Sequence, residues 1–347
     1  MNYQSVVITR KGGPEVLQVA ENPLREPGPN EVRVRVLCTG VGFTDVVMRY
    51  GYYPYAPKIP FAPGYDVVGV IDALGDGVTG GWTVGQRVAS LTVTGGYAEY
   101  VYLAPDDLVA VPDGLDPAEA VCLVLNYATA YQLLHREAQV EAGQTVFANG
   151  ASGGVGQALL ELGRLAGVTT YGLCSPSKFG VVEALGGVPI DYTKNGGDYV
   201  EEVRARTPGG EGVDAALDGL GGSHVNRCFD LTKHGGHTVL YGFTTSVKDG
   251  HADNTDVFKG MLSYALHKVF PAGRKVTFYG VTALYRKDKG PFHEDLPVLF
   301  DLLREGKIKP RIAAKLPLTE AARANAMLEA GGVGGKIVLV CTPEGEW

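Results

Sequence analysis

The sequence has no hydrophobic run long enough to cross a bilayer, because no stretch approaches the roughly 18 apolar residues that a spanning helix needs. Its start carries only a short apolar stretch, Val6-Val7-Ile8, where a signal peptide would have a longer apolar core. It also has no block of basic residues, and its net charge of −7 gives no attraction to nucleic-acid phosphates or anionic lipid. We therefore expect a cytoplasmic protein with no membrane and no nucleic-acid partner.

Cysteine is sparse, and its pattern excludes several kinds of site. The five cysteines are odd in number, far apart and never spaced as CxxC: Cys38, Cys122, Cys174, Cys228 and Cys341. Such spacing suits reduced thiols better than a disulfide framework. We therefore expect buried, reduced thiols.

Glycine, by contrast, is abundant, with 49 of 347 residues or about twice the usual share. These glycines follow no G-X-Y period, so they serve tight turns and close approaches of the backbone. Hydrophobic residues make up 45% of the chain and charged residues 20%, which is typical of a globular protein. The length is sufficient for about two domains.

The first 120 or so residues consist of short β-like runs broken by glycine and proline. The run over 32–36 alternates V-R-V-R-V, and similar runs follow at 67–71, 87–91 and 97–103. This pattern predicts an all-β, barrel-like domain.

From Thr145 the pattern changes to strands that alternate with helices, which predicts an α/β domain with a parallel sheet. Six strands are expected, at 145–148, 169–174, 188–191, 213–218, 237–242 and 276–281. Later helices at 294–305 and 319–329 and strands at 312–316 and 336–340 should return to the first domain. The polar stretch 248–256 is predicted to be a loop, and 257–270 an amphipathic helix used for packing. The domains are then 1–124 with 284–347, and 125–283.

A glycine-rich turn lies between the predicted strand 145–148 and a predicted helix over 157–166. Its sequence over 150–156, G-A-S-G-G-V-G, has the form A-x-G-x-x-G. In this context backbone N–H groups and a helix N-terminus point toward a pyrophosphate. We therefore predict a dinucleotide site that includes Ala151, Ser152, Gly153, Gly154, Val155 and Gly156.

The end of the second predicted strand indicates which dinucleotide binds. A site that prefers NAD has Asp or Glu there, whereas this chain has Ser175-Pro176-Ser177-Lys178. A 2′-phosphate needs a cation and hydroxyl donors, so Ser175 and Lys178 favour NADPH, although a lysine solvated on a helix surface is the alternative. Tyr192 is expected either beside the adenosine or in edge packing. Residues after later strands, Gly219, Gly242, Phe243 and Thr244, are predicted to form the floor under the cofactor.

These and other motifs together carry a family resemblance. They are the segments 40–45, 49–54, 60–66, 95–100, 129–131, 150–156, 218–222 and 303–310. The chain resembles the zinc-independent medium-chain dehydrogenases/reductases, in the quinone oxidoreductase (zeta-crystallin-like) branch, nearly from end to end. The resemblance implies a GroES-like β-barrel catalytic domain joined to a Rossmann doubly wound parallel sheet, NADPH as cofactor and a homodimer.

The resemblance also implies roles for individual residues. Zinc-dependent relatives have Cys, His and Glu where this chain has Gly42, Tyr65 and Asp66, so metal catalysis is not expected. Tyr53 matches the active-site tyrosine of the family, with Tyr52 and water as rival proton donors. Thr129 matches a position beside the nicotinamide, with packing within its helix as the alternative. Gly42 stands where many members of the family have Asn. Asp45 is expected to orient the loop in which it lies.

The activity expected from this resemblance is hydride transfer from NADPH to a small-molecule quinone or enone, because such acceptors are already electrophilic. An enoyl-thioester or alkenal reductase is the alternative within enzymes. A non-catalytic, crystallin-like protein that binds NADPH is the alternative of another class. The apolar segment 276–281, as the last strand of the sheet, would be an exposed edge, and exposed edges favour pairing. The predicted homodimer would join these strands.

Overall fold

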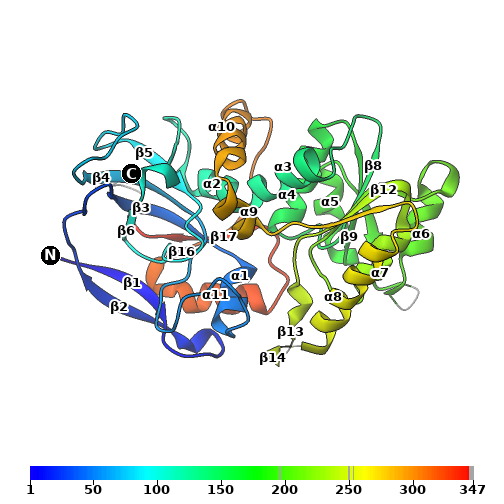
Figure 1. Ribbon diagram of the computed structural model, residues 1–347, viewed down its shortest axis with the longest axis horizontal. Coiled ribbons are helices and arrows are strands. Elements are labelled where there is room, and N and C mark those ends of the chain that lie inside the picture. The colour runs from blue at the N-terminus through cyan, green and yellow to red at the C-terminus, as the bar shows by residue number, and fades with distance from the viewer. Residues whose placement is uncertain (195–196, 249–250, 253, 344–347) are drawn as a thin grey trace. The chain divides into compact units, whose positions relative to one another are not determined.

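The computed structural model describes residues 1–194, 197–248, 251–252 and 254–343 (Figure 1). The chain forms two compact units, Met1–Ala128 with Tyr285–Trp347, and Thr129–Leu284. The boundaries expected from the sequence, after residues 124 and 283, lie close to these positions.

The first unit is built on a seven-stranded sheet and a separate hairpin. The hairpin pairs β1 (Asn2–Ile8) with β2 (Leu17–Pro23). The large sheet has the order β16-β17-β3-β4-β5-β7, with β6 paired to β3. Its strands are β3 (Val32–Val41), β4 (Val67–Leu74), β5 (Arg87–Ser90), β6 (Tyr100–Leu103), β7 (Val109–Ala110), β16 (Ile312–Pro317) and β17 (Lys336–Val340). The C-terminal strands therefore return to the first unit, as the sequence predicted.

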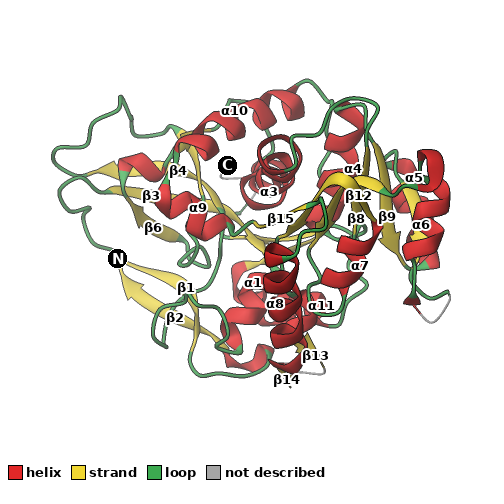
Figure 2. Cartoon of the chain, turned by 45° about the vertical axis from the view of Figure 1, so that its right-hand side comes forward, coloured by secondary structure: helices red, strands yellow, loops and turns green. Residues whose placement is uncertain are grey.

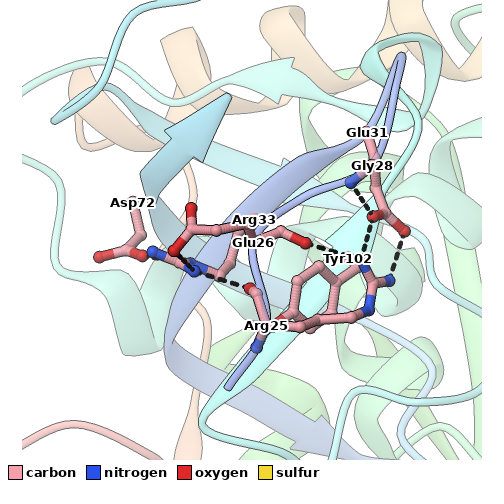
Figure 3. A network of polar contacts seen from close by, with 7 residues as sticks. All are labelled: Arg25, Glu26, Gly28, Glu31, Arg33, Asp72 and Tyr102. Atoms are coloured by element: carbon pink, nitrogen blue, oxygen red, sulfur yellow. Dashed lines mark hydrogen bonds and ion pairs between the residues drawn. The ribbon is translucent and has the colours of Figure 1, made fainter. Parts of the chain in front are cut away.

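Alternation along β3 separates a buried face from a charged one. Val32, Val34 and Val36 are fully buried, while Arg33 faces outward. The Arg33 guanidinium bonds the Asp72 carboxylate at 2.5 Å, in a surface network that also includes a pair between Arg25 and Glu31 at 2.5 and 2.8 Å (Figure 3). Arg33 of the V-R-V-R-V run therefore forms ion pairs with acidic side chains on the outer surface of the sheet.

The described helices along the chain vary in length and position. They are α1 (Phe43–Arg49), α2 (Pro117–Cys122), α3 (Ala128–Gln132), α4 (Gly154–Leu165), α5 (Phe179–Ala184), α6 (Val200–Arg206), α7 (His224–Leu231), α8 (Asn254–Val269), α9 (Val281–Lys287), α10 (Gly290–Arg304) and α11 (Ala321–Glu329) (Figure 2). None of these helices combines the length and apolar character needed to span a bilayer.

The second unit contains a six-stranded parallel sheet. Its order is β10-β9-β8-β11-β12-β15, with strands β8 (Thr145–Ala148), β9 (Thr169–Cys174), β10 (Val188–Asp191), β11 (Val213–Asp218), β12 (Thr232–Leu240) and β15 (Lys275–Phe278). In chain order this is 3-2-1-4-5-6, the order of the Rossmann fold. The strand order reverses between the parallel neighbours β8 and β11, because the chain adds β9 and β10 on one side of β8 and then crosses to its other side. Ligands bind such sheets outside the carboxyl ends of the strands at this point.

Helices cover both faces of this sheet. On one face Tyr171 and Leu173 of β9 pack with Val203 of α6 and Cys228 of α7. On the other face Cys174 packs with Leu160 of α4 and Val182 of α5, and phenylalanine and leucine side chains of the α5 segment complete the cluster. The near-continuous apolar runs of these strands are explained by burial on both sides.

Two expectations for this unit were wrong in detail. The predicted strand 276–281 ends at Phe278, because the chain enters α9 at Val281. The predicted loop 248–256 instead includes β14 (His251–Ala252), which pairs with β13 (Val247–Lys248), and the first turn of α8. The apolar residues over 276–281 do not show where β15 ends and α9 begins, because Val281 suits a strand as well as a helix.

Helix α8 packs on one side, as expected, but leaves much of its apolar surface exposed. One side of the helix contacts α7, where the His267 ring stacks on Phe229 at 3.7 Å between centroids. The exposed apolar side chains on and after the helix are Phe258, Met261, Leu262, Leu266, Val269 and Phe270. We call these six residues the α8 stripe.

Candidate functional site

The glycine-rich turn connects β8 to the N-terminus of α4. Gly150 has φ +63°, which a residue with a side chain rarely adopts, and Gly153 caps the helix with extended backbone and no side-chain hydrogen bond. A Cβ on Gly156 would lie 2.3 Å from the Gly150 carbonyl oxygen. The first N–H groups of α4 therefore have no side-chain cap, and the absence of a side chain at Gly156 lets the helix start close against the turn.

The other predicted residues of the turn differ in exposure. The Ala151 N–H donates to the Leu173 carbonyl of β9 at 3.1 Å, and Ala151 is fully buried. The Ser152 carbonyl accepts a bond from the Gln157 amide at 2.7 Å, whereas the Ser152 side chain is only partly buried. Gly154 and Val155 form the first residues of α4. The turn is thus anchored at Ala151 and more open at the start of the helix.

An amide and a carboxylate connect the loops on either side of the switch point. The Asn149 amide, directly after β8, donates to the Asp218 carboxylate at the end of β11. The Asn149 amide oxygen accepts the Gly219 N–H at 2.8 Å. The Asp218 Oδ1 atom also accepts the N–H groups of Leu220 and Gly221, each at 3.0 Å. These bonds fix the two loops where a ligand of this fold would lie.

The same network has an electrostatic cost. Asp218 is fully buried, and its burial raises the pKa of the carboxyl above its usual value, while backbone N–H donors lower it. Its second oxygen has no hydrogen-bond partner among the described residues. The N–H donors fix the geometry of the loop and favour the ionised carboxylate, whereas its burial disfavours ionisation.

The predicted floor residues come together through backbone contacts. The Thr244 N–H and hydroxyl both approach the Gly219 carbonyl oxygen at 3.3 Å. A Cβ on Gly242 would lie 2.6 Å from that same oxygen, and the Phe243 ring packs on Phe278 at 6.0 Å between centroids. The loops after β11 and β12 are therefore in direct contact.

The residues predicted to select the cofactor follow β9 and β10. Ser175 precedes α5, and its hydroxyl bonds that of Ser177 at 3.0 Å. Lys178 directly precedes the first residue of α5 and is partly buried. Tyr192 is 47% exposed. Asp191, the last residue of β10, accepts the Thr193 hydroxyl at 2.7 Å, which lowers the pKa of its carboxyl.

In the first unit, the predicted tyrosines follow α1. Tyr52 is 46% exposed, while Tyr53 is partly buried and packs edge-on against Tyr55 and Tyr65. The Tyr53 hydroxyl oxygen lies 2.6 Å from the Tyr65 hydroxyl oxygen. Thr129, the third predicted residue, belongs to the second unit, on α3, and is 5% exposed.

Asp45 holds the loop that bears these tyrosines, in the role the sequence indicated. Its carboxylate accepts the N–H groups of Gly42 and Gly64 at 2.8 and 3.0 Å and the Tyr97 hydroxyl at 3.0 Å. The side chain is fully buried, and this desolvation raises the pKa of Asp45 to about 6. Three donors on one carboxylate leave it poorly suited to shuttling protons.

The positions that hold zinc ligands in zinc-dependent relatives have other uses here. Gly42 has no ligand atom, and the Tyr65 hydroxyl bonds Tyr53. The Asp66 carboxylate accepts the Lys336 ammonium at 2.9 Å, and both side chains are buried. Across the described ranges no three His, Cys, Asp or Glu side chains form a group that could hold a metal ion. A lysine therefore supplies the positive charge beside Asp66.

Sequence reasoning did not identify three of these partners as parts of the site: Asn149, Tyr65 as a hydrogen-bond donor or acceptor, and Lys336. Asn149 carried a signal, since it directly follows a predicted strand before the glycine turn. Lys336 carried none, because 270 residues separate it from Asp66.

Comparisons with known proteins agree with this architecture. Residues 28–113 match the alcohol dehydrogenase GroES-like domain, and residues 188–339 match the family described as zinc-binding dehydrogenase. The chain is 33% identical to a Danio rerio protein named synaptic vesicle membrane protein VAT-1 homolog, over 98% of this chain and 70% of that protein. It is 28% identical to the Homo sapiens quinone oxidoreductase, over 97% of both chains.

Solved structures give the same result. The quinone oxidoreductase of Pseudomonas syringae pv. Tomato DC3000 is 29% identical, with a TM-score of 0.85 over 97% of this chain and 99% of that one. A mycobacterial structure complexed with NADPH is 28% identical, with a TM-score of 0.84 over the same shares. The chain is therefore an oxidoreductase of the medium-chain dehydrogenase/reductase family and belongs to its zinc-independent quinone oxidoreductase (zeta-crystallin-like) branch.

Proposed function

We propose that this protein transfers hydride from NADPH to quinones or to activated α,β-unsaturated carbonyl compounds without a metal ion. The observation that carries the proposal is the uncapped N-terminus of α4 behind a turn in which a Cβ on Gly156 would meet the Gly150 backbone. Such a turn suits a dinucleotide pyrophosphate. The names of the quinone oxidoreductase relatives and the mycobacterial NADPH complex support the same reaction class.

Each group of residues has a role in this proposal. The N–H groups at Gly154 to Gly156 would bind the pyrophosphate, and the Lys178 ammonium with the Ser175 hydroxyl would bind the 2′-phosphate of NADPH. When bound, NADPH supplies the hydride. Gly219, Gly242 and Thr244 would support it from below, with Phe243, Tyr192 and Thr129 as further contacts.

The choice of acceptor follows from the donors that the chain offers. An unactivated ketone needs strong polarisation of its oxygen, and a tyrosine hydroxyl with water provides only a modest donor. Tyr53 would donate a hydrogen bond or proton to the developing oxyanion, with Tyr52 as its rival. Because the Asp66 carboxylate is already paired with Lys336, the usual metal-binding position offers no ligand set for polarising a carbonyl.

The test is NADPH oxidation with a quinone, an enone and a saturated aliphatic aldehyde in parallel. We expect turnover of the quinone or enone to exceed that of the aldehyde, and transfer of deuterium from labelled NADPH to the product. Tyr53→Phe should lower turnover on the order of tenfold, since water can replace the donor, while Tyr55→Phe serves as the matched control. Preferential reduction of the aldehyde, or no NADPH oxidation with any acceptor, would contradict the proposal.

Two glycine variants test the cofactor turn itself. A Cβ on Gly156 would meet backbone atoms at 2.3 to 2.7 Å, whereas one on Gly153 would meet only the Gly150 oxygen at 3.3 Å. Gly156→Ala should therefore weaken NADPH binding far more than Gly153→Ala. Equal affinities in both variants, measured by calorimetry, would argue against this turn as the binding site.

We also propose that the protein is a homodimer joined through β15. This strand is at the edge of the six-stranded sheet, where its outer backbone groups can pair with a second copy, and the α8 stripe with the exposed Phe278 lies on neighbouring elements. Light scattering at micromolar concentration should give a dimer, and Phe278→Glu should shift it to monomer. The control is Val84→Glu, at an exposed position of the first unit. A monomeric wild-type protein would refute the assignment.

A further inference from the structure

A buried tyrosine, Tyr65, contacts the hydroxyl of the proposed proton donor. Tyr65 is 1% exposed, and its hydroxyl oxygen lies 2.6 Å from that of Tyr53, with the two rings edge to face. Either oxygen can be the donor. The distance is that of a strong O–H···O hydrogen bond. Tyr65 is therefore hydrogen-bonded to Tyr53, the residue that in our proposed function donates a proton to the acceptor.

The backbone around Tyr65 is fixed on both sides. Before it, the Gly64 N–H donates to the Asp45 carboxylate at 3.0 Å, and the Gly64 carbonyl accepts the Thr92 hydroxyl at 2.9 Å. After it, the Asp66 carboxylate accepts both the Lys336 ammonium and the Gly40 N–H, at 2.9 and 2.8 Å. The backbone that carries the Tyr65 side chain is consequently held by polar contacts of its two chain neighbours, and the ring itself is buried.

Tyr53, by contrast, lies in a turn. The Ala56 N–H donates to the Tyr53 carbonyl at 3.2 Å, and Gly51, two residues before Tyr53, has φ +76°. The Tyr53 ring is partly buried rather than enclosed. Proton donation requires a hydroxyl in a defined position, and the bond to the buried Tyr65 hydroxyl supplies one such constraint on Tyr53.

We propose that Tyr65 is a positioning residue for the reduction, and this inference rests on the proposed function. Tyr65 donates its hydrogen bond to the Tyr53 oxygen, which directs the Tyr53 O–H toward the acceptor. As hydride adds to the acceptor, the Tyr53 proton passes to the acceptor oxygen. The Tyr53 phenolate keeps the hydrogen bond from Tyr65 and regains a proton from water. The acceptor thus gains a hydride, which is one hydrogen nucleus with two electrons, from the cofactor and one proton from Tyr53.

The test is a double-mutant cycle on steady-state turnover with NADPH and a quinone. We expect Tyr65→Phe to lower kcat about three- to tenfold with the KM for NADPH unchanged, and to reduce the solvent deuterium isotope effect. In the Tyr53→Phe background the same substitution should change kcat by less than about twofold, because the hydroxyl it positions is gone. Tyr55→Phe, which leaves the hydroxyl pair intact, should resemble wild type.

The outcomes separate this inference from the proposed function. A wild-type protein that oxidises NADPH, together with a Tyr65→Phe variant of unchanged kcat, would overturn the inference alone. Equal losses in the wild-type and Tyr53→Phe backgrounds would also overturn it, since they would indicate a general structural role. A wild-type protein inactive with every acceptor would overturn both.

A second substitution keeps the inference testable if Tyr65→Phe does not fold. Site-specific replacement of Tyr65 by 3-fluorotyrosine keeps the ring and the hydroxyl but changes the strength of the hydrogen bond. We expect kcat to change in the wild-type background and not in the Tyr53→Phe background. The same kcat before and after fluorination in both backgrounds would contradict the positioning role.

Discussion

The two units stabilise their buried aspartates in different ways. In the first unit the Asp66 carboxylate pairs with the Lys336 ammonium at 2.9 Å, a partner 270 residues away in the chain. In the second unit the Asp218 carboxylate is held by the Asn149 side-chain amide, 69 residues away, and by two backbone N–H groups of its own loop. A cation thus compensates the buried carboxylate in one unit, and neutral donors do so in the other. The comparison teaches that buried residues of the same type can be stabilised by partners of different charge, although in both units one partner is distant in the chain.

The largest expected effect is the loss of the Lys336 ammonium. Lys336→Met leaves the Asp66 carboxylate buried beside an apolar chain, which should lower the free energy of unfolding by about 3–5 kcal/mol. The measurement is denaturant unfolding monitored by circular dichroism. Adding Asp66→Asn to this variant should recover part of the loss, because the unpaired charge is removed.

A matched control shows whether burial is the cause. Lys307 and Glu305 form an ion pair at 2.7 Å in which both side chains are about half exposed. Lys307→Met should lower the free energy of unfolding by less than about 1 kcal/mol. Equal losses for the two lysine substitutions would break the comparison.

Asp45, a buried aspartate of the first unit, tests through pH how burial without a paired cation affects stability. Burial raises its pKa from 3.8 to about 6, so the folded protein binds this proton more tightly than the unfolded chain does. Its contribution to stability is therefore fully present below the unfolded pKa and is lost as the pH rises through 6. Relative to Asp45→Asn, the wild-type free energy of unfolding should fall by about 2–3 kcal/mol between pH 4 and pH 7.5. A difference that stays constant over this range would show that the burial of Asp45 has no such effect.

Lys178 tests whether a single charge selects the cofactor in the second unit. Lys178→Ala should weaken NADPH binding by about 1.5–3 kcal/mol, the range for a hydrogen bond to a charged group, and leave NADH binding nearly unchanged. Lys178→Arg, which keeps the charge, should retain most of the preference. Titration of each variant with both cofactors gives the answer, and an unaltered NADPH/NADH ratio in Lys178→Ala would remove Lys178 from the site.

The smallest effect is expected on the surface of the first unit. The bond to Arg25 lowers the pKa of the Glu31 carboxyl, but the Arg25 side chain is 53% exposed. Glu31→Gln should therefore change the free energy of unfolding by only about 0.2–1 kcal/mol, and less at high salt. A loss as large as that of Lys336→Met would show that exposure does not set the scale of these pairs.

Much of the fold was predictable because its signals are local. The alternation over 32–36 predicted β3, and the repeated strand and helix pattern after Thr145 predicted the parallel sheet with six strands. The glycine turn at 150–156 was recognisable because strand, turn and helix follow one another directly. The start of α9 and the exposed side of α8 were not predictable, because apolar residues alone do not reveal what covers them.

The sequence by itself determined the order of the elements, the position of the glycine turn and the absence of the usual zinc ligands at Gly42, Tyr65 and Asp66. Each of these depends on residues that are neighbours in the chain. Only the tertiary structure decided that Tyr65 contacts Tyr53 and that Lys336 pairs with Asp66. These contacts depend on how loops and distant strands pack around a buried polar group, which must find a partner wherever the fold places one.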